Sequence, residues 1–197
     1  MSYTNRDLVR TIKDDPNKAI EILKSGDVDP SFNNNIIIQI ASDYNDIRVM
    51  RELLKDPRVD PSVNNNYVIK HSSEMLNFDV IKELLKDPRV DPSIDNDHVF
   101  NNACSVGDVE VVKTLLKDKR VDPSTDNNYP IRFASMNGHV NVVKELLKDK
   151  RVDPSDYDNF AIEWAGIGGH LDVVRELVNH MGGVMKLGKL KFKLEEK

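Results

Sequence analysis

The histidines and the single cysteine are the side chains of this sequence best suited to hold a metal ion or to act as nucleophiles. The histidines are His71, His98, His139, His170 and His180. No two of them stand one helical turn apart with a carboxylate beside them, as a zinc site on a helix would require. Cys104 is alone, so neither an intramolecular disulfide nor a cysteine-based zinc site can form. We therefore expect no metal, and we expect Cys104 to be a packed free thiol.

Glycine-rich and acidic motifs indicate no catalytic site either. The segment GIGGH, from Gly166 to His170, follows an expected helix, whereas a phosphate-binding loop follows a strand and precedes Lys-Ser or Lys-Thr. A pair of carboxylates for acid–base catalysis would be expected at one place, in a pocket. Here aspartate and serine recur in register along the chain, at Asp29, Asp60, Asp91, Asp122, Asp153 and at Ser31, Ser62, Ser93, Ser124, Ser155. The sequence thus predicts a protein that is not an enzyme and needs no cofactor.

Composition narrows the remaining classes. The net charge is −5 and the lysines are interleaved with acids, so we expect no nucleic-acid partner. The longest apolar run, IIIQIA from Ile36, is far shorter than the roughly 20 residues of a membrane span. The start of the chain lacks the apolar stretch of a secretory signal, and one cysteine fits a reducing compartment. These observations favour a cytoplasmic protein with no membrane association.

The triplet Val-Asp-Pro recurs with a constant spacing and no insertion or deletion. It begins at Val28, Val59, Val90, Val121 and Val152. A leucine-like pair, and a β-branched pair four residues before it, keep the same register, as in VVKELL from Val142. A fixed period of this kind is the signature of a repeat protein, in which a unit buries its apolar face only against its neighbours.

Each unit is predicted to contain a short helix, a longer helix and a loop. Apolar residues at i, i+1, i+4 and i+5 place one stripe on the longer helix. The shorter helix, for example YPIRFASM, would be capped by Asn128, and the connector RVDPSxxNN indicates an extended loop or hairpin. The residues expected to cap the longer helices are Asp15, Asp46, Asn77 and Asp108.

The segment YPIRFASMNGHVNVVKELL, Tyr129–Leu147, resembles the ankyrin repeat family position by position. That family opens its first helix with Thr-Pro-Leu-His, follows it with two small residues and Gly-His, and ends its second helix in leucines. Here these motifs fall on Tyr129–Arg132, Ala134–Ser135, Gly138–His139 and the final Leu-Leu. The segment from Phe160 follows the same layout. The resemblance implies that His139 and His170 are structural turn histidines.

The resemblance implies an all-α fold, an ankyrin-repeat solenoid of about six helix-turn-helix units with short connecting loops or hairpins. The repeat domain is expected over residues 1–181, with a Lys-rich tail over 182–197. The repeats are expected at 4–31, 32–62, 63–93, 94–124, 125–155 and 156–181.

Three departures from the family pattern stand out. The unit is two residues shorter than the usual repeat of about 33 residues, similar to a divergent variant found in giant DNA viruses of amoebae and in amoebae. The opening threonine is replaced by Tyr67, His98, Tyr129 and Phe160, so the family's hydrogen bonds there cannot be assumed. Asn45 and Leu76 replace the glycine between the helices, and we expect less regular turns there.

The two ends of the array differ. The first repeat carries polar residues where an exposed cap needs them, and Thr4 with Asp7 resembles a capping box. In the tail, Lys alternates with Leu or Phe from Lys189 to Leu194. This segment could be a basic strand, a membrane-surface or partner-binding segment, a flexible tail, or a partial cap over the last repeat; we favour the last two readings.

By analogy with the family, the chain is expected to bind another protein without catalysis, as a monomer. The family's geometry places one column of the first helices on the concave side, at Ile40, His71, Asn102, Phe133 and Trp164. The neighbouring column is Gln39, Lys70, Asn101, Arg132 and Glu163. Loop tips would add a polar rim at Asn33, Asn34, Asn64, Asn65, Asp95, Asn96, Asp126 and Asn127, residues that also suit a turn.

Other readings of the function stay open. Phe133 and Trp164 could pack between repeats instead of facing a partner. The array could be an adaptor that recruits a substrate for a ubiquitin ligase supplied by a separate subunit, or a spacer with no specific partner. If the chain is viral, the host cytoplasm is its expected location. The sequence does not name the partner.

Overall fold

The computed structural model describes residues 2–182, except for the side chain of Asn96. These residues form twelve α-helices and no strand, which confirms the all-α class and makes the connectors loops rather than paired hairpins. The helices are α1 Asn5–Asp14, α2 Pro16–Ser25, α3 Phe32–Asp43, α4 Ile47–Leu54, α5 Val63–Glu74, α6 Phe78–Leu84, α7 Ile94–Val106, α8 Val109–Leu115, α9 Thr125–Met136, α10 Val140–Leu146, α11 Asp156–Ile167 and α12 Leu171–His180. The tail from 183 onward lies outside the described residues.

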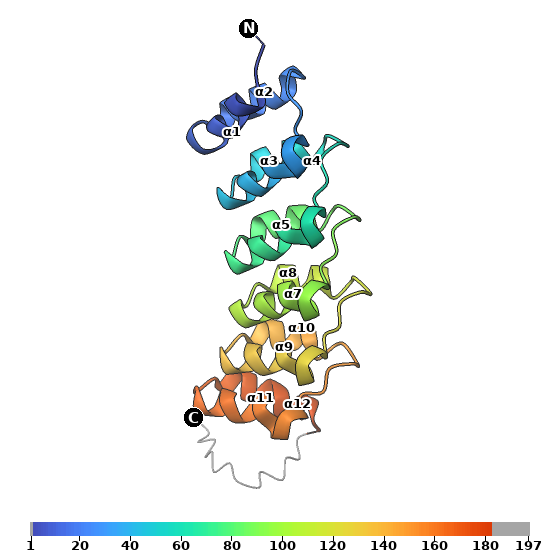
Figure 1. Ribbon diagram of the computed structural model, residues 1–197. Coiled ribbons are helices and arrows are strands. Elements are labelled where there is room, and N and C mark those ends of the chain that lie inside the picture. The colour runs from blue at the N-terminus through green and yellow to red at the C-terminus, as the bar shows by residue number, and fades with distance from the viewer. Residues whose placement is uncertain (1, 183–197) are drawn as a thin grey trace. The chain divides into compact units, whose positions relative to one another are not determined.

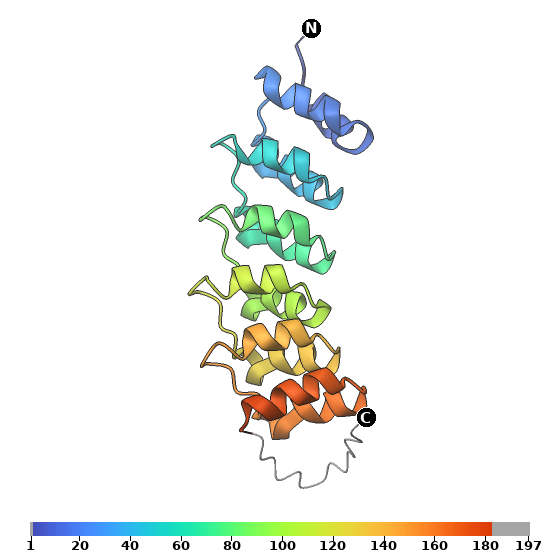
Figure 2. The ribbon, with the colours of Figure 1, turned by 180° about the vertical axis from the view of Figure 1, so that it is seen from behind.

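The chain divides into two compact units, residues 1–99 and 100–197, and α7 runs across that boundary. In the first unit, α1 packs on α2 and α3, α3 packs on α5, and α2 and α6 pack on either side of α4. Figure 1 shows these as successive helix pairs whose connecting loops project to one side. In the second unit, α9 packs on α11, while α8 and α12 flank α10, as the rear view in Figure 2 also shows.

The core of each unit consists of the repeating apolar columns. In α4, Val49, Met50 and Leu53 are completely buried, while Leu54 is half-buried at the helix end. The same pattern holds in α6, α8 and α10. Because burying one such side chain contributes about 1.5–3 kcal/mol, the second helices contribute much of the stability.

Helix caps were only partly predicted. Thr4 and Asp7 form the expected capping box, and the side chains of Asp15, Asp46 and Asp108 accept the expected backbone hydrogen bonds. Asn77 stands at the N-cap of α6, but its side chain makes no cap bond. Its Nδ2 instead donates to the backbone oxygen of Ser42, 3.1 Å away in the preceding repeat.

The Asx-rich runs form left-handed turns at the start of the first helices, within the bounds of α3, α5, α9 and α11 but before their regular helical turns. Asn64, Asn65 and Asn66 all have φ between 53° and 57°. The corresponding residues of three other repeats, 33–35, 126–128 and 157–159, have the same conformation. A residue with a Cβ loses roughly 1–2 kcal/mol in this region, and Asn and Asp tolerate it best. This backbone requirement explains why these runs are rich in Asn and Asp.

The last residue of the run ties its repeat to the next loop. Asn66 Oδ1 accepts a hydrogen bond of 2.7 Å from the backbone N–H of Asp91. Asn35 and Asn128 accept equivalent bonds of 2.8 Å from Asp60 and Asp153. The prediction that Asn128 caps its helix is therefore wrong: its left-handed backbone places the side chain against the following loop, where the buried amide satisfies a backbone donor.

The recurring Asp, Ser and Arg residues hold the connectors. Asp60 Oδ1 accepts bonds from both the N–H and the hydroxyl of Ser62, and the pattern recurs along the chain. One turn earlier, Arg58 donates through Nε and Nη2 to Asp56, which lowers the pKa of that carboxyl group. This confirms that the recurring acids and serines belong to the scaffold.

The turn between the two helices of a repeat uses a left-handed residue whether or not it is glycine. Gly138 has φ 76°, and a Cβ there would lie 2.5 Å from Nδ1 of His170. Asn45 and Leu76 have φ 51° and 57° and make the same backbone bond to a residue three positions back. The expectation of a less regular turn is wrong at Leu76, where the N–H of Asn77 donates to the backbone oxygen of Ser72 as that of His139 donates to Ala134 in the glycine turn.

Leu76→Gly should raise the free energy of unfolding by about 1 kcal/mol, because glycine adopts φ 57° without the Cβ clash and Leu76 is half exposed. Met75→Gly is the matched control, since Met75 is equally exposed but has φ −85°. Urea unfolding followed by circular dichroism measures both. A Leu76→Gly protein that loses as much stability as Met75→Gly would contradict this account of the turn.

Candidate functional site

In the first unit, the candidate binding columns are mostly polar, and their basic side chains pair with neighbouring acidic residues. Nε2 of His71 lies 3.0 Å from Oδ1 of Asp43, and its ring stacks on Tyr67 with centroids 5.3 Å apart. Lys70 forms an ion pair with Asp95 that raises the pKa of the lysine. Gln39 donates to the backbone oxygen of Asn34 in the left-handed turn, and Ile40 is half-buried.

In the second unit the same columns contribute to an aromatic cluster. We call Tyr129, Phe133, Tyr157, Phe160 and Trp164 the aromatic ridge. Tyr129 and Phe133 stack on α9 with ring centroids 3.9 Å apart, and Phe160 stacks with Trp164 at 5.4 Å on α11. Phe133 and Phe160 join the two repeats at 6.2 Å. Phe133 is half-buried by these contacts, whereas Trp164 remains 41% exposed.

Arg132 lies inside the aromatic ridge rather than on an open surface. It is 9% exposed, and its guanidinium carbon lies 4.5 Å from the ring centre of Tyr157 and 5.2 Å from that of Phe160. Its Nη2 donates to the backbone oxygen of Asp126 over 2.8 Å. A planar, weakly hydrated guanidinium stacks well on aromatic rings, which explains its burial in the cluster.

The remaining members of the two columns are spread over α7 and α11. Asn101 and Asn102 are half-buried on α7, and Glu163 is exposed on α11. Asp156 accepts a 3.0 Å bond from Nδ2 of Asn128, which lowers the pKa of that carboxyl group. Burial raises the pKa of Tyr129. Tyr157, Asp158, Glu163 and Trp164 therefore present aromatic rings and carboxylates to solvent.

The sequence analysis proposed Phe133, Trp164 and Arg132 as binding residues. It did not predict that Tyr129, Tyr157 and Phe160 join them in one cluster. The missed residues occupy other columns: Tyr129 and Phe160 open the first helices, and Tyr157 lies in the left-handed turn. The available signal was composition, because the chain has few aromatic residues and five of them fall between 129 and 164.

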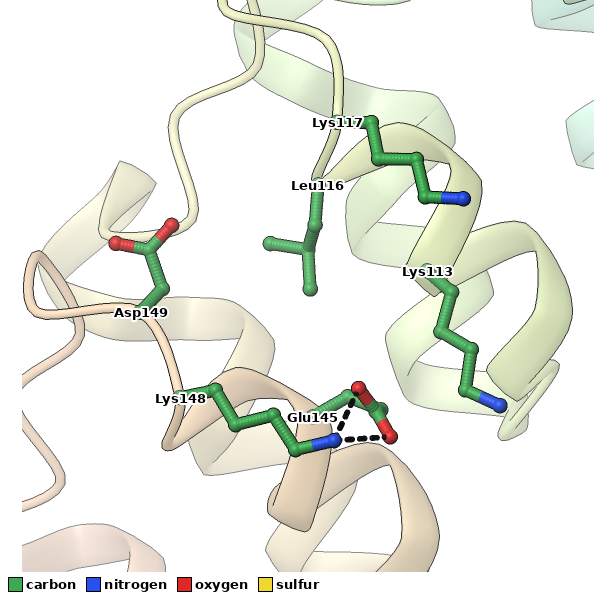
Figure 3. Close-up of a pocket in the computed structure, with 6 residues that line it drawn as sticks. All are labelled: Lys113, Leu116, Lys117, Glu145, Lys148 and Asp149. Atoms are coloured by element: carbon green, nitrogen blue, oxygen red, sulfur yellow. Dashed lines mark hydrogen bonds and ion pairs between the residues drawn. The ribbon is translucent and has the colours of Figure 1, made fainter.

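The other chemically capable residues have structural roles or form no site. His139 Nε2 lies 2.9 Å from the backbone oxygen of Ser105, as expected of a turn histidine. Among residues 2–182 no group of three potential ligands could hold a metal ion. A shallow pocket of about 380 Å³ lies beside α8 and α10, where Lys148 pairs with Glu145 at 2.8 Å (Figure 3). Lys113 and Asp149, which also line the pocket, pair with Glu110 and Arg151.

Comparisons with known proteins agree with this architecture. The family model described as ankyrin repeats (3 copies) matches residues 100–186. The crystal structure of an ankyrin repeat domain from Acinetobacter baumannii AYE is similar, with a TM-score of 0.67 and 18% sequence identity. The match covers 88% of this chain and 97% of that one. The comparison with curated proteins gave no match.

The expected ankyrin-repeat solenoid fold is thus confirmed by the solved structure over most of the chain, and the family model matches the repeats of residues 100–186. Repeat proteins of this kind generally present an extended concave surface for binding. Within residues 2–182, none of the helices is long and apolar enough to cross a membrane.

Cys104 should not react with thiol reagents while the repeats are folded. It is completely buried on α7, and burial raises the pKa of its thiol well above the usual value, so little thiolate forms at pH 8. We expect labelling by an aromatic disulfide reagent, followed by absorbance, to be slow in buffer and fast in denaturant. Rapid labelling in buffer would contradict this placement of the thiol.

Proposed function

We propose that the chain is a non-enzymatic scaffold that binds a partner protein through the face formed by its first helices and through the loop tips beside it. The observation that carries the proposal is the aromatic ridge. Its Trp164 and Tyr157 rings are 41% and 60% exposed, although apolar rings of this size are normally buried. Exposed Trp, Tyr and buried Arg in one cluster are the composition of a binding hot spot.

The ridge is already rigid before a partner arrives. Stacking fixes Phe160 against Trp164, and Arg132 is held by both the rings and the Asp126 carbonyl. Side chains that are fixed in advance lose little conformational entropy on binding, so their contact area converts efficiently into affinity. The ridge therefore supplies the apolar anchor of the proposed interface.

In the first unit, the proposed surface is polar. Ile40, His71 and Lys70 lie on it, but His71 and Lys70 are engaged by acidic neighbours. The loop-tip asparagines are required by the left-handed turns, and Asn34 also donates to Asn64 over 2.9 Å. These groups can add specificity at the rim, while the aromatic ridge provides most of the affinity.

Three further features of the proposal derive from the sequence. The constant spacing and the RVDPS connector support a divergent ankyrin variant similar to those of giant DNA viruses and amoebae. The composition supports a cytoplasmic protein, in the host if the chain is viral, without nucleic-acid partners. We propose a monomer.

The second candidate function is a substrate-recruiting adaptor for a ubiquitin ligase or other host machinery supplied by a separate subunit.

The test compares two double variants of the full chain. Tyr157→Ala with Trp164→Ala removes the exposed rings of the ridge, and Phe32→Ala with Tyr44→Ala removes two similarly exposed rings elsewhere. Each protein is used to capture partners from a candidate host lysate, and mass spectrometry identifies what is retained. We expect the ridge variant to lose a partner that the wild type and the control retain, because its affinity falls by about tenfold or more.

Circular dichroism and the urea midpoint must first show that both variants fold like the wild type. Equal retention of every partner by the ridge variant and the wild type would contradict the site. A ubiquitin ligase subunit among the partners retained by the ridge variant would favour the adaptor function.

A further inference from the structure

The last described helix pair leaves an apolar face exposed. On α11, Trp164 and Ile167 follow one helical stripe, and Leu171 begins α12; they are 41%, 62% and 53% exposed. The equivalent residues of the preceding repeat are Phe133, Met136 and Val140, which are all half-buried. The two repeats therefore carry apolar residues in the same columns. They differ because no described residue covers the far side of α11 and α12.

The other end of the chain shows what an exposed terminal face requires. In α1, Leu8 and Ile12 are buried against the repeat, while Arg6, Asp7 and Arg10 face the solvent. A stack of repeats needs such a polar outer face at each end to stay soluble. In the last described repeat, Ile167 and Leu171 instead leave apolar surface exposed.

We propose that the segment Lys189–Leu194 of the same chain covers this face. In the sequence KLKFKL, an extended backbone would place Leu190, Phe192 and Leu194 on one side and the lysines on the other. The apolar side matches Trp164, Ile167 and Leu171, and the lysine side supplies the missing polar surface. The contact is an internal cap. It shares Trp164 with the interface proposed above, so the partner would have to displace the segment from this ring.

The reach of the chain permits this contact. Leu190 follows Gly182, the last described residue, by eight residues, which span at most about 28 Å when extended. Residues 160–167, the regular part of α11, span about 12 Å along the helix axis. The segment can therefore reach any part of the exposed stripe without straining α12.

Trp164 reports on this contact directly because it is the single tryptophan of the chain. The experiment compares the full chain with a variant carrying Leu190→Ser, Phe192→Ser and Leu194→Ser. We expect the variant to show a red-shifted Trp164 emission maximum and a larger acrylamide quenching constant, because the indole becomes more exposed to water. The matched control carries Lys189→Gln, Lys191→Gln and Lys193→Gln, and should keep the emission of the wild type.

Three results would overturn the proposal. The first is identical emission and quenching in the wild type and the apolar variant. The second is a change in the lysine variant that equals that of the apolar variant, since the lysines are placed toward solvent. The third is a dependence of the wild-type signal on protein concentration, because the cover would then come from a second copy. Unchanged secondary structure and urea midpoints would show that the repeats fold alike in all three proteins.

Discussion

A partly buried hydrogen bond between the two ends of one repeat determines how one loop is placed on the next. In it, the backbone N–H of an aspartate donates to the side-chain amide oxygen of the asparagine 25 residues earlier. It recurs at 2.7–2.8 Å for Asn35, Asn66 and Asn128. Its geometry requires the asparagine backbone to be left-handed, which in turn requires residues that tolerate positive φ. The aspartate whose N–H is held in this way uses its own side chain to hold the serine two residues later. One contact thus accounts for three of the recurring columns.

Once the loops are fixed, positions that vary between repeats can acquire other roles. Ser42 and Ser72 share a buried 2.7 Å hydrogen bond in the first unit, while Cys104 and Ser135 occupy the column of Ser42 in the second unit. The first helices of the second unit carry the aromatic ridge, with Arg132 enclosed by its rings. The scaffold is therefore uniform, whereas the aromatic ridge lies in the repeats formed by α9 to α12.

The repeat spacing predicted the number, order and apolar faces of the helices, because periodicity and burial are local properties of the sequence. It also placed the caps at Asp46 and Asp108, where an aspartate precedes a clear helical stripe. It failed at Asn77 and Asn128, because asparagine can cap a helix, hold a turn or bridge two repeats, and the partner lies 25 or more residues away. The burial of Arg132 was not predictable either, since it depends on rings from two repeats that meet only after folding.

Substitution of Asn66 tests the central claim most directly, because it separates the hydrogen bond from the backbone requirement. Asn66→Gly keeps the left-handed conformation but loses the acceptor for the Asp91 N–H, and Asn66→Ala loses both. Urea unfolding should show the wild type to be the most stable, with Asn66→Gly lower by about 1–3 kcal/mol and Asn66→Ala lower by about a further 1 kcal/mol. Equal stability of the wild type and the Asn66→Gly variant would contradict the role assigned to the hydrogen bond, and equal stability of the two variants would contradict the role of the left-handed turn.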